Sequence, residues 1–227
     1  MKEHIMKTKL IAAVIVMMAL SESGFSQNIN WRSLREDQRN LLQLNVGYDY
    51  GLTAQMGYGR TFTMFRPAMV GIDFSVPMGN NLLDDFKVRL GGQIEILEIT
   101  GFSVTVRIAS VFRKYQSSMV NIVSFGSDFA VVAGYCTPTW SVGSEFGFDK
   151  AITSRFMHSD VMKARYPGIK DGWYVPTGGH FYYGVQTGTT LGESLDVSLR
   201  LGATKTQFHD QEAMIPYYLQ FGLGARF

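Results

Sequence analysis

The chain has 227 residues, a formal net charge of +2 and a hydrophobic content of 46%. The nearly balanced charge excludes the strongly basic surface of a nucleic-acid-binding protein, and the length suits one domain or two small ones. A single cysteine, Cys136, excludes a disulfide within one chain, so the fold must be stabilised by other means.

The first 26 residues have the three-part pattern of a secretory signal peptide. Lys7 and Lys9 precede the apolar run 10–20, and small residues stand at Gly24 and Ser26. This apolar run is too short to cross a lipid core of about 30 Å as a helix. We therefore expect cleavage after Ser26 and export of the remaining chain.

Beyond the signal, no apolar stretch is long enough for a membrane-spanning helix. Apolar and polar residues alternate instead, as in 102–112 (FSVTVRIASVF) and 195–201 (LDVSLRL). A period of two predicts strands with one apolar and one polar face. Ten such strands are expected, over residues 41–50, 52–62, 67–77, 86–98, 101–115, 121–136, 139–152, 179–191, 194–206 and 215–227.

The connections between these segments alternate between short and long. Residues 137–139 and 192–193 are short turns, whereas 156–179 is a long loop. This alternation predicts an all-β, transmembrane, antiparallel up-and-down barrel of about ten strands. An even strand number places both termini at the rim of short turns and the 156–179 loop at the opposite rim.

The apolar faces are expected to contact lipid rather than a second sheet. Their centres are aliphatic and uncharged, for example at Val106, Ile108 and Leu199. Outward aromatic residues gather instead at the strand ends, including Phe112 and Trp140. Two aromatic belts around an aliphatic band are typical of a barrel in a bilayer.

The final segment, 215–227 (IPYYLQFGLGARF), has apolar residues at alternate positions and ends in a phenylalanine. It resembles the last strand of bacterial outer-membrane β-barrel proteins of the small, porin-like class. The resemblance implies residence in the outer membrane of a Gram-negative bacterium and contact with its lipid. It also implies that the barrel-assembly machinery recognises Phe221 and Phe227 during insertion.

These interpretations divide the chain into three expected parts. Residues 1–26 are the signal peptide, 27–40 a periplasmic segment and 41–227 the barrel. The 27–40 segment, which contains Trp31, is a candidate cap for the lower opening.

The inward faces carry charges of both signs in nearly equal number: Asp49, Asp73, Lys87, Arg89, Glu95, Arg107, Arg113, Asp128, Glu145, Asp149, Asp196, Arg200 and Arg226. A selective pore would show an excess of one sign. Balanced charge in a barrel of about ten strands, near the size that side chains fill, predicts ion pairs that close the lumen.

Strand register suggests partners for these lumen ion pairs. A turn at Ser117-Ser118 would place Arg107 opposite Asp128, and a symmetric loop 78–84 would place Asp73 opposite Arg89. Glu145 and Arg200 are the remaining members of the predicted set.

Inward glycines, including Gly134, Gly143 and Gly188, favour one of two outcomes near the rim of short turns. They relieve crowding and permit curvature, or they leave a water-filled vestibule below a constriction.

The 156–179 loop is the most individual segment. Ser159-Asp160 predicts a short helix through Arg165, ended by Pro167-Gly168. Three aromatic residues, Tyr166, Trp173 and Tyr174, either recognise an extracellular ligand or fold back over the barrel mouth.

Three functions remain open. The first is a structural or loop-presenting barrel with a largely closed lumen, and the second is a narrow passive channel for small solutes. The third is a membrane-embedded hydrolase or acyltransferase, in which His180 would act with Asp149 or Ser159. No spacing assigns a catalytic residue, and we expect no cofactor, no metal and no nucleic-acid partner.

Overall fold

In a computed structural model, residues 29–79, 83–175, 178–207 and 215–227 are described. The predicted signal peptide lies outside these residues. The elements are η1 (Trp31–Ser33), β1 (Asn40–Tyr48), β2 (Leu52–Thr63), β3 (Pro67–Pro77), β4 (Asp85–Ile99), β5 (Phe102–Gln116), β6 (Val120–Cys136), β7 (Trp140–His158), α2 (Asp160–Arg165), β8 (Gly172–Tyr174), β9 (Gly179–Leu191), β10 (Leu195–Thr206) and β11 (Tyr217–Arg226).

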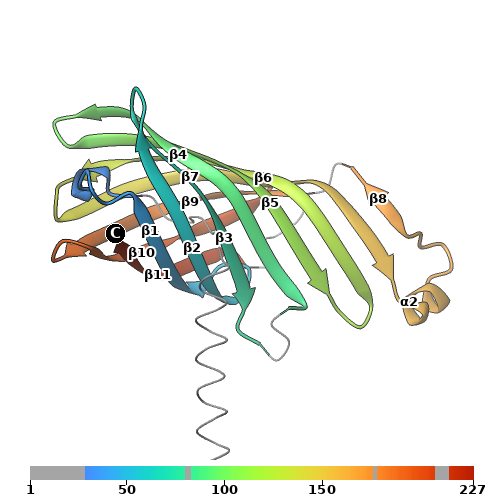
Figure 1. The fold of residues 1–227 in the computed structure, drawn as a ribbon. Coiled ribbons are helices and arrows are strands. Elements are labelled where there is room, and N and C mark those ends of the chain that lie inside the picture. Colours follow the sequence, from blue (N-terminus) through green and yellow to red (C-terminus); the bar gives the residue numbers. More distant parts are fainter. Residues whose placement is uncertain (1–28, 80–82, 176–177, 208–214) are drawn as a thin grey trace, which may run out of the picture.

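Ten of these strands form a closed antiparallel barrel (Figure 1). Each strand pairs with its neighbours in sequence, β7 pairs with β9, and β1 closes the sheet by pairing with β11. The three-residue strand β8 adds to the free edge of β7. The predicted ten-stranded, up-and-down, all-β architecture is therefore confirmed. No helix in the described part of the chain is both long and apolar enough to cross a membrane.

The two ends of the barrel sheet meet at one rim, which we call the terminal rim. Asn40 and Phe227 exchange backbone hydrogen bonds of 2.9 and 3.0 Å there. Short turns close the hairpins at the same rim. One is the two-residue turn Thr100-Gly101, in which both residues have positive φ, as a type I′ hairpin requires. The placement of both ends of the barrel sheet beside the short turns is confirmed.

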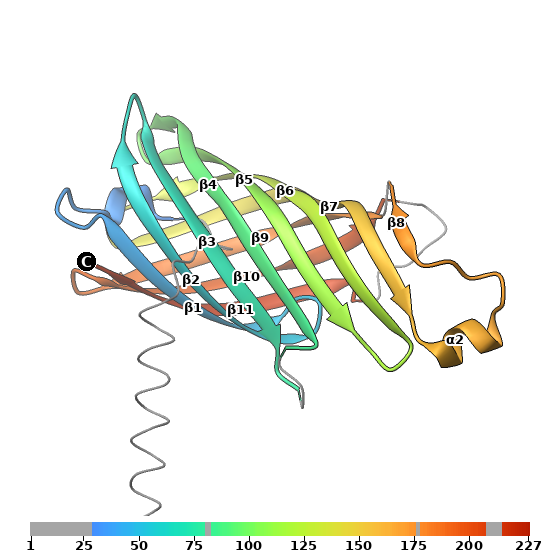
Figure 2. The same cartoon turned by 45° about the vertical axis from the view of Figure 1, so that its right-hand side comes forward.

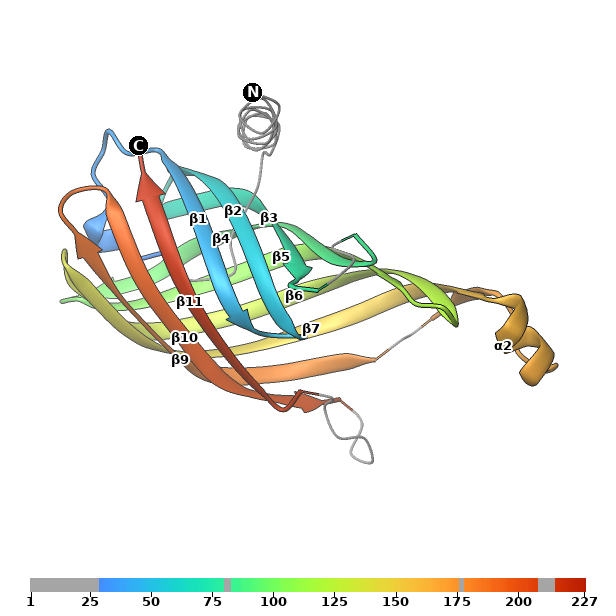
Figure 3. The same ribbon diagram turned by 90° about the horizontal axis from the view of Figure 1, so that it is seen from below.

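The opposite end, which we call the loop rim, is uneven. The strands β5, β6 and β7 have 15, 17 and 19 residues, against 9 in β1 and 10 in β11. One wall therefore extends beyond the rest of the barrel, and α2 projects from its tip, away from the mouth (Figures 2 and 3). The alternative in which this loop folds over the mouth is wrong.

The outer surface is apolar, as the strand pattern predicts. Val46, Val70, Leu90, Ile108 and Leu219 are each about half exposed to the surroundings of the barrel. Near the loop rim, successive outward rings form a row with centroid separations of 5.1 to 6.2 Å, in the order Phe74, Phe86, Phe112, Phe125 and Trp173. This row is part of one of the two expected aromatic belts.

The register predicted for the β5–β6 hairpin is wrong by two residues. Arg107 lies opposite Ala130, and Asp128 lies opposite Ala109. The reason is the turn: the Ser117 hydroxyl accepts hydrogen bonds from the backbone N–H groups of Met119 and Val120. This local hydroxyl-to-backbone bonding moves the centre of the turn to residues 118–119.

Candidate functional site

The middle of the lumen is filled by a layer of charged side chains. Asp73 on β3 lies opposite Arg89 on β4, and Arg89 Nε donates to both carboxylate oxygens at 3.0 and 2.9 Å. Arg89 Nη1 lies 3.6 Å from the Asp128 carboxylate on β6. One guanidinium thus connects two acids from strands three positions apart in the barrel order.

Arg107 and Asp128 also meet, although they are not cross-strand neighbours. The Tyr182 hydroxyl on β9 donates to Asp128 at 2.6 Å and accepts from Arg107 Nη2 at 2.9 Å. The Tyr182 ring fits because the facing residue on β7 is Gly147, where a Cβ atom would overlap the ring. A phenol therefore joins the pair that a direct cross-strand contact was expected to join.

The other half of the layer is organised around Glu145 on β7. Its carboxylate accepts from Arg200 Nε at 2.5 Å, the Tyr218 hydroxyl at 2.6 Å and Gln186 Nε2 at 3.1 Å. The Arg200 guanidinium also lies over the Tyr182 and Tyr218 rings, 5.2 and 4.4 Å from their centroids. These ring contacts connect the two halves.

We call this layer the central network: Asp73, Arg89, Arg107, Asp128, Glu145, Tyr182, Arg200 and Tyr218. Its three acids balance its three arginines, and none of its members is more than 7% exposed. Burying a charge is costly unless it is paired and hydrogen-bonded. Pairing across the lumen meets this requirement, and the central network as a whole is neutral and buried.

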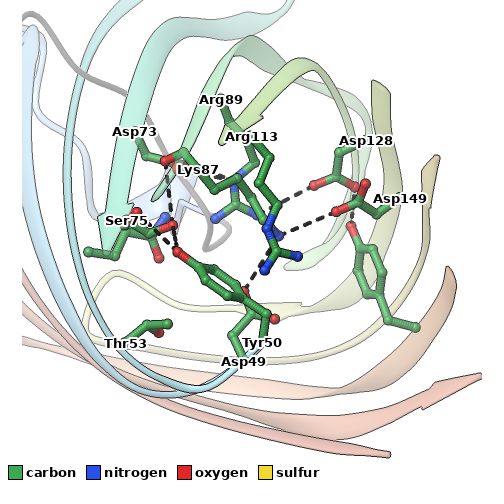
Figure 4. Close-up of polar contacts among 12 residues, drawn as sticks. Asp49, Tyr50, Thr53, Asp73, Ser75, Lys87, Arg89, Arg113, Asp128 and Asp149 are labelled. Carbon is green, nitrogen blue, oxygen red and sulfur yellow. Dashed lines mark hydrogen bonds and ion pairs between the residues drawn. The ribbon is translucent and has the colours of Figure 1, made fainter. Parts of the chain in front are cut away.

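A second cluster lies nearer the loop rim, and we call it the loop-rim cluster: Asp49, Tyr50, Lys87, Arg113 and Asp149. The turn between β1 and β2 folds inward, so the Tyr50 ring lies under Lys87 and Arg113, with the charged groups 4.9 and 4.4 Å from its centroid. The Tyr50 hydroxyl donates to the Ser75 carbonyl at 3.0 Å. Figure 4 shows these side chains converging inside the barrel. Tyr50 therefore lies inside the lumen beside Ser75, on the loop-rim side of the central network.

The residues before β1 close the terminal rim, and we call residues 29–39 the N-terminal plug. Trp31 is buried and donates from Nε1 to the Thr105 hydroxyl at 2.9 Å inside the barrel. Arg32 and Arg35 form ion pairs with Glu98 and Glu193 at the rim.

A cavity of about 60 Å³ remains between the N-terminal plug and the central network. Its lining includes Ile29, Gln186 and the inward glycines Gly134, Gly143 and Gly188. A cavity of this size holds a few water molecules. The glycines thus line a small pocket in the half of the lumen nearer the terminal rim.

The loop aromatics lie on the projecting wall. The Trp173 ring packs on Phe125 in the outward aromatic row, and the Tyr174 ring packs edge-on against Phe156 at 5.4 Å. Tyr166 is about half exposed at the end of α2. The predicted helix is present, with the Ser159 hydroxyl accepting from the Met162 N–H as its N-cap.

Asp171 fastens this loop to β7. Its carboxylate accepts from the backbone N–H of His158 at 2.8 Å and pairs with Lys163 Nζ at 2.7 Å. The His158 N–H and then the Lys163 ammonium hold the pKa of Asp171 well below its usual range.

Of the two partners considered for a catalytic His180, the structure places only one beside it. His180 lies opposite Asp149 across β9 and β7. Ser159 is ten residues from Asp149 along an extended strand that rises about 3.3 Å per residue, so it lies roughly 30 Å away. Its hydroxyl is used as the cap of α2. The structure therefore brings His180 beside Asp149 but not beside Ser159.

Sequence reasoning missed three tyrosines of the lumen, Tyr50, Tyr182 and Tyr218. Alternation alone places Tyr182 and Tyr218 inward, because Phe181 and Tyr217 face outward. Nothing in a three-residue turn indicates that Tyr50 folds inward. Their ring and hydroxyl contacts hold the charged layer together.

A closed antiparallel barrel with an apolar exterior, aromatic belts and a polar interior has the fold of outer-membrane β-barrels. No family model and no curated protein sequence matches this chain.

Solved structures similar to the chain are barrels of diverse activity. One, described as the KdgM porin in complex with disordered oligogalacturonate, has 6% identity over 82% of this chain and 99% of its own, with a TM-score of 0.42. Another is the outer membrane protease OmpT from Escherichia coli, with 10% identity over 84% and 97% and a TM-score of 0.44. A third is the β domain of the Bordetella autotransporter BrkA, with 10% identity over 85% and 99% and a TM-score of 0.39. These likenesses carry no inference about activity.

Proposed function

We propose that this protein is an integral barrel of the bacterial outer membrane that acts structurally and presents its projecting wall at the cell surface, with a lumen closed to solutes. The observation that carries this proposal is the central network, in which three arginines and three acids bridge strands on different sides of the barrel. Opening a path would separate buried charges, at a cost of several kcal/mol per ion.

The proposed location follows from the outer surface. An aliphatic band with aromatic residues towards both rims suits a lipid bilayer. Export by cleavage after Ser26, and recognition of Phe221 and Phe227 by the barrel-assembly machinery, complete the proposed route to the outer membrane. The loop rim then faces outward, and the loop around Tyr166 is available to an extracellular ligand.

The narrow passive channel is the competing function, and solute flux distinguishes the two. Liposomes containing the refolded protein are diluted into isotonic arabinose or glycine, and swelling is followed by light scattering. The closed-lumen proposal predicts swelling no faster than in protein-free liposomes. Swelling that increases with protein content and decreases with solute size would establish the channel and overturn the proposal.

A further inference from the structure

Cations gather on the outer surface near the loop rim. The outward strand positions there carry Lys114, Lys150, Arg155 and Lys205, and no carboxylate among the described residues. A charge on the outer surface is tolerated near a rim but not at mid-bilayer. These four cations therefore lie where headgroups, rather than hydrocarbon, surround the barrel.

Two of the cations belong to one cross-strand row. Phe86 lies opposite Lys114, Lys114 opposite Val123, Val123 opposite Arg155, and Arg155 opposite Trp173. We call these five residues the Lys114–Arg155 row. It runs aromatic, cation, aliphatic, cation, aromatic across β4 to β8. Adjacent strands lie about 4.8 Å apart, so the two cation-bearing backbones are roughly 10 Å apart and their side chains can reach one headgroup.

Neither cation has an acidic partner in the part of the chain that the structure describes. Lys114 Nζ makes only a long, solvent-exposed hydrogen bond of 3.4 Å to the Leu83 carbonyl. Arg155 is exposed at the strand surface. The inward cations are different, since Lys87, Arg89, Arg113 and Arg200 all pair with acids. Lys114 and Arg155 therefore have no carboxylate among the described residues to compete with an external anion.

The rings beside the row fix its depth in the membrane. Phe112 and Phe125 stand one step closer to the barrel middle, 5.1 Å apart, and Trp173 continues their line at 6.2 Å from Phe125. Aromatic belts mark the boundary between hydrocarbon and headgroups. The two cations of the row, Lys114 and Arg155, thus lie just on the headgroup side of this boundary.

We propose that the Lys114–Arg155 row is a binding site for a phosphate-bearing lipid headgroup. Lys114 supplies a point charge, and Arg155 supplies a planar donor group that suits phosphate oxygens. Phe112 and Phe125 contact the upper part of the acyl chains. Trp173 then has a defined role, because it flanks the headgroup next to Arg155. This inference depends on the membrane location but not on the closed lumen.

The test uses the full mature chain refolded in nanodiscs of equal parts phosphatidic acid and phosphatidylcholine. Native mass spectrometry after release counts the retained lipids of each kind. The unsubstituted protein should retain phosphatidic acid preferentially. The variant Lys114→Gln/Arg155→Gln should lose roughly fivefold in this preference for each cation removed.

Two controls separate a site from general charge attraction. Arg60→Gln/Arg66→Gln removes two exposed cations near the terminal rim and should leave the preference unchanged. Lys114→Arg/Arg155→Lys keeps both charges and should retain most of it. Folding of each variant is checked by its heat-dependent gel mobility, and Lys114→Gln alone replaces the double variant if that variant does not fold.

An equal loss in the Arg60/Arg66 control would show only general attraction, and unchanged retention in the Lys114/Arg155 variant would show that the row does not bind phosphate. Either result overturns the proposal. Both are independent of solute flux through the lumen, so the lipid site and the closed lumen can fail separately.

Discussion

Replacing Glu145 by alanine should strongly destabilise the barrel. The substitution removes the acceptor of three hydrogen bonds, from Arg200, Tyr218 and Gln186. Among the described residues, Arg200, which is 4% exposed, then keeps the Gln220 side-chain oxygen and two ring faces as partners. An uncompensated buried charge of this kind costs about 3–5 kcal/mol.

The chain contains a matched exposed pair. Arg35 and Glu193 approach to 2.5 Å, the same separation as in Arg200 and Glu145, but their side chains are 50% and 77% exposed. Glu193→Ala should therefore cost about 0–1 kcal/mol. Replacing both buried partners, as Glu145→Leu/Arg200→Met, should recover much of the lost stability, because no unpaired charge remains.

The assay is reversible urea unfolding in lipid vesicles, followed by tryptophan fluorescence. The free energy of unfolding should fall markedly for Glu145→Ala, fall little for Glu193→Ala, and recover in the Glu145/Arg200 double variant. Similar losses for Glu145→Ala and Glu193→Ala, or no recovery in the double variant, would refute the reasoning that burial makes the lumen pairs costly to break.

Three further predictions concern the lumen, the lipid face and the loop. Gly147→Ala should displace the Tyr182 ring and lower the urea midpoint, and an unchanged midpoint would contradict the close packing. Leu199→Arg, at mid-bilayer, should lower the free energy of unfolding by about 2–4 kcal/mol, whereas Leu195→Arg at the strand end should lower it by about 0–1 kcal/mol. Equal losses of stability would show that the bilayer does not lie at the proposed height on the barrel. Because the pKa of Asp171 is lowered in the folded chain, its contribution to loop stability is complete above its unfolded value of about 4 and is lost as pH falls below it. Proteolysis of the loop around α2 by pepsin should therefore rise more between pH 4.5 and pH 2.5 in the parent than in Asp171→Asn.

The sequence predicted the barrel well because apolar and polar residues must alternate along a strand that faces lipid on one side and a polar lumen on the other. Ten strands, their order and their inward faces all follow from a period of two. The expected neighbours Asp73 and Arg89 lie opposite each other.

Other features depended on local or long-range contacts that alternation does not encode. The Ser117 hydroxyl shifted the β5–β6 turn and with it the partners of Arg107 and Asp128. Tyr182 on β9 reaches Asp128 and Arg107 on strands two and three positions away in the barrel order, and alternation does not encode contacts between strands that are not neighbours. The length of β7 was underestimated because β8 pairs with its extension and satisfies backbone groups beyond the barrel.

The central claim is that the central network closes the lumen, and single-channel conductance in planar bilayers tests it most directly. The refolded protein is added at high load, with insertion verified by recovery from the membrane. The account predicts a silent bilayer for the parent protein and discrete openings for a variant that removes the network, Glu145→Ala/Arg200→Ala/Tyr182→Ala. Steady openings from the parent protein would contradict it.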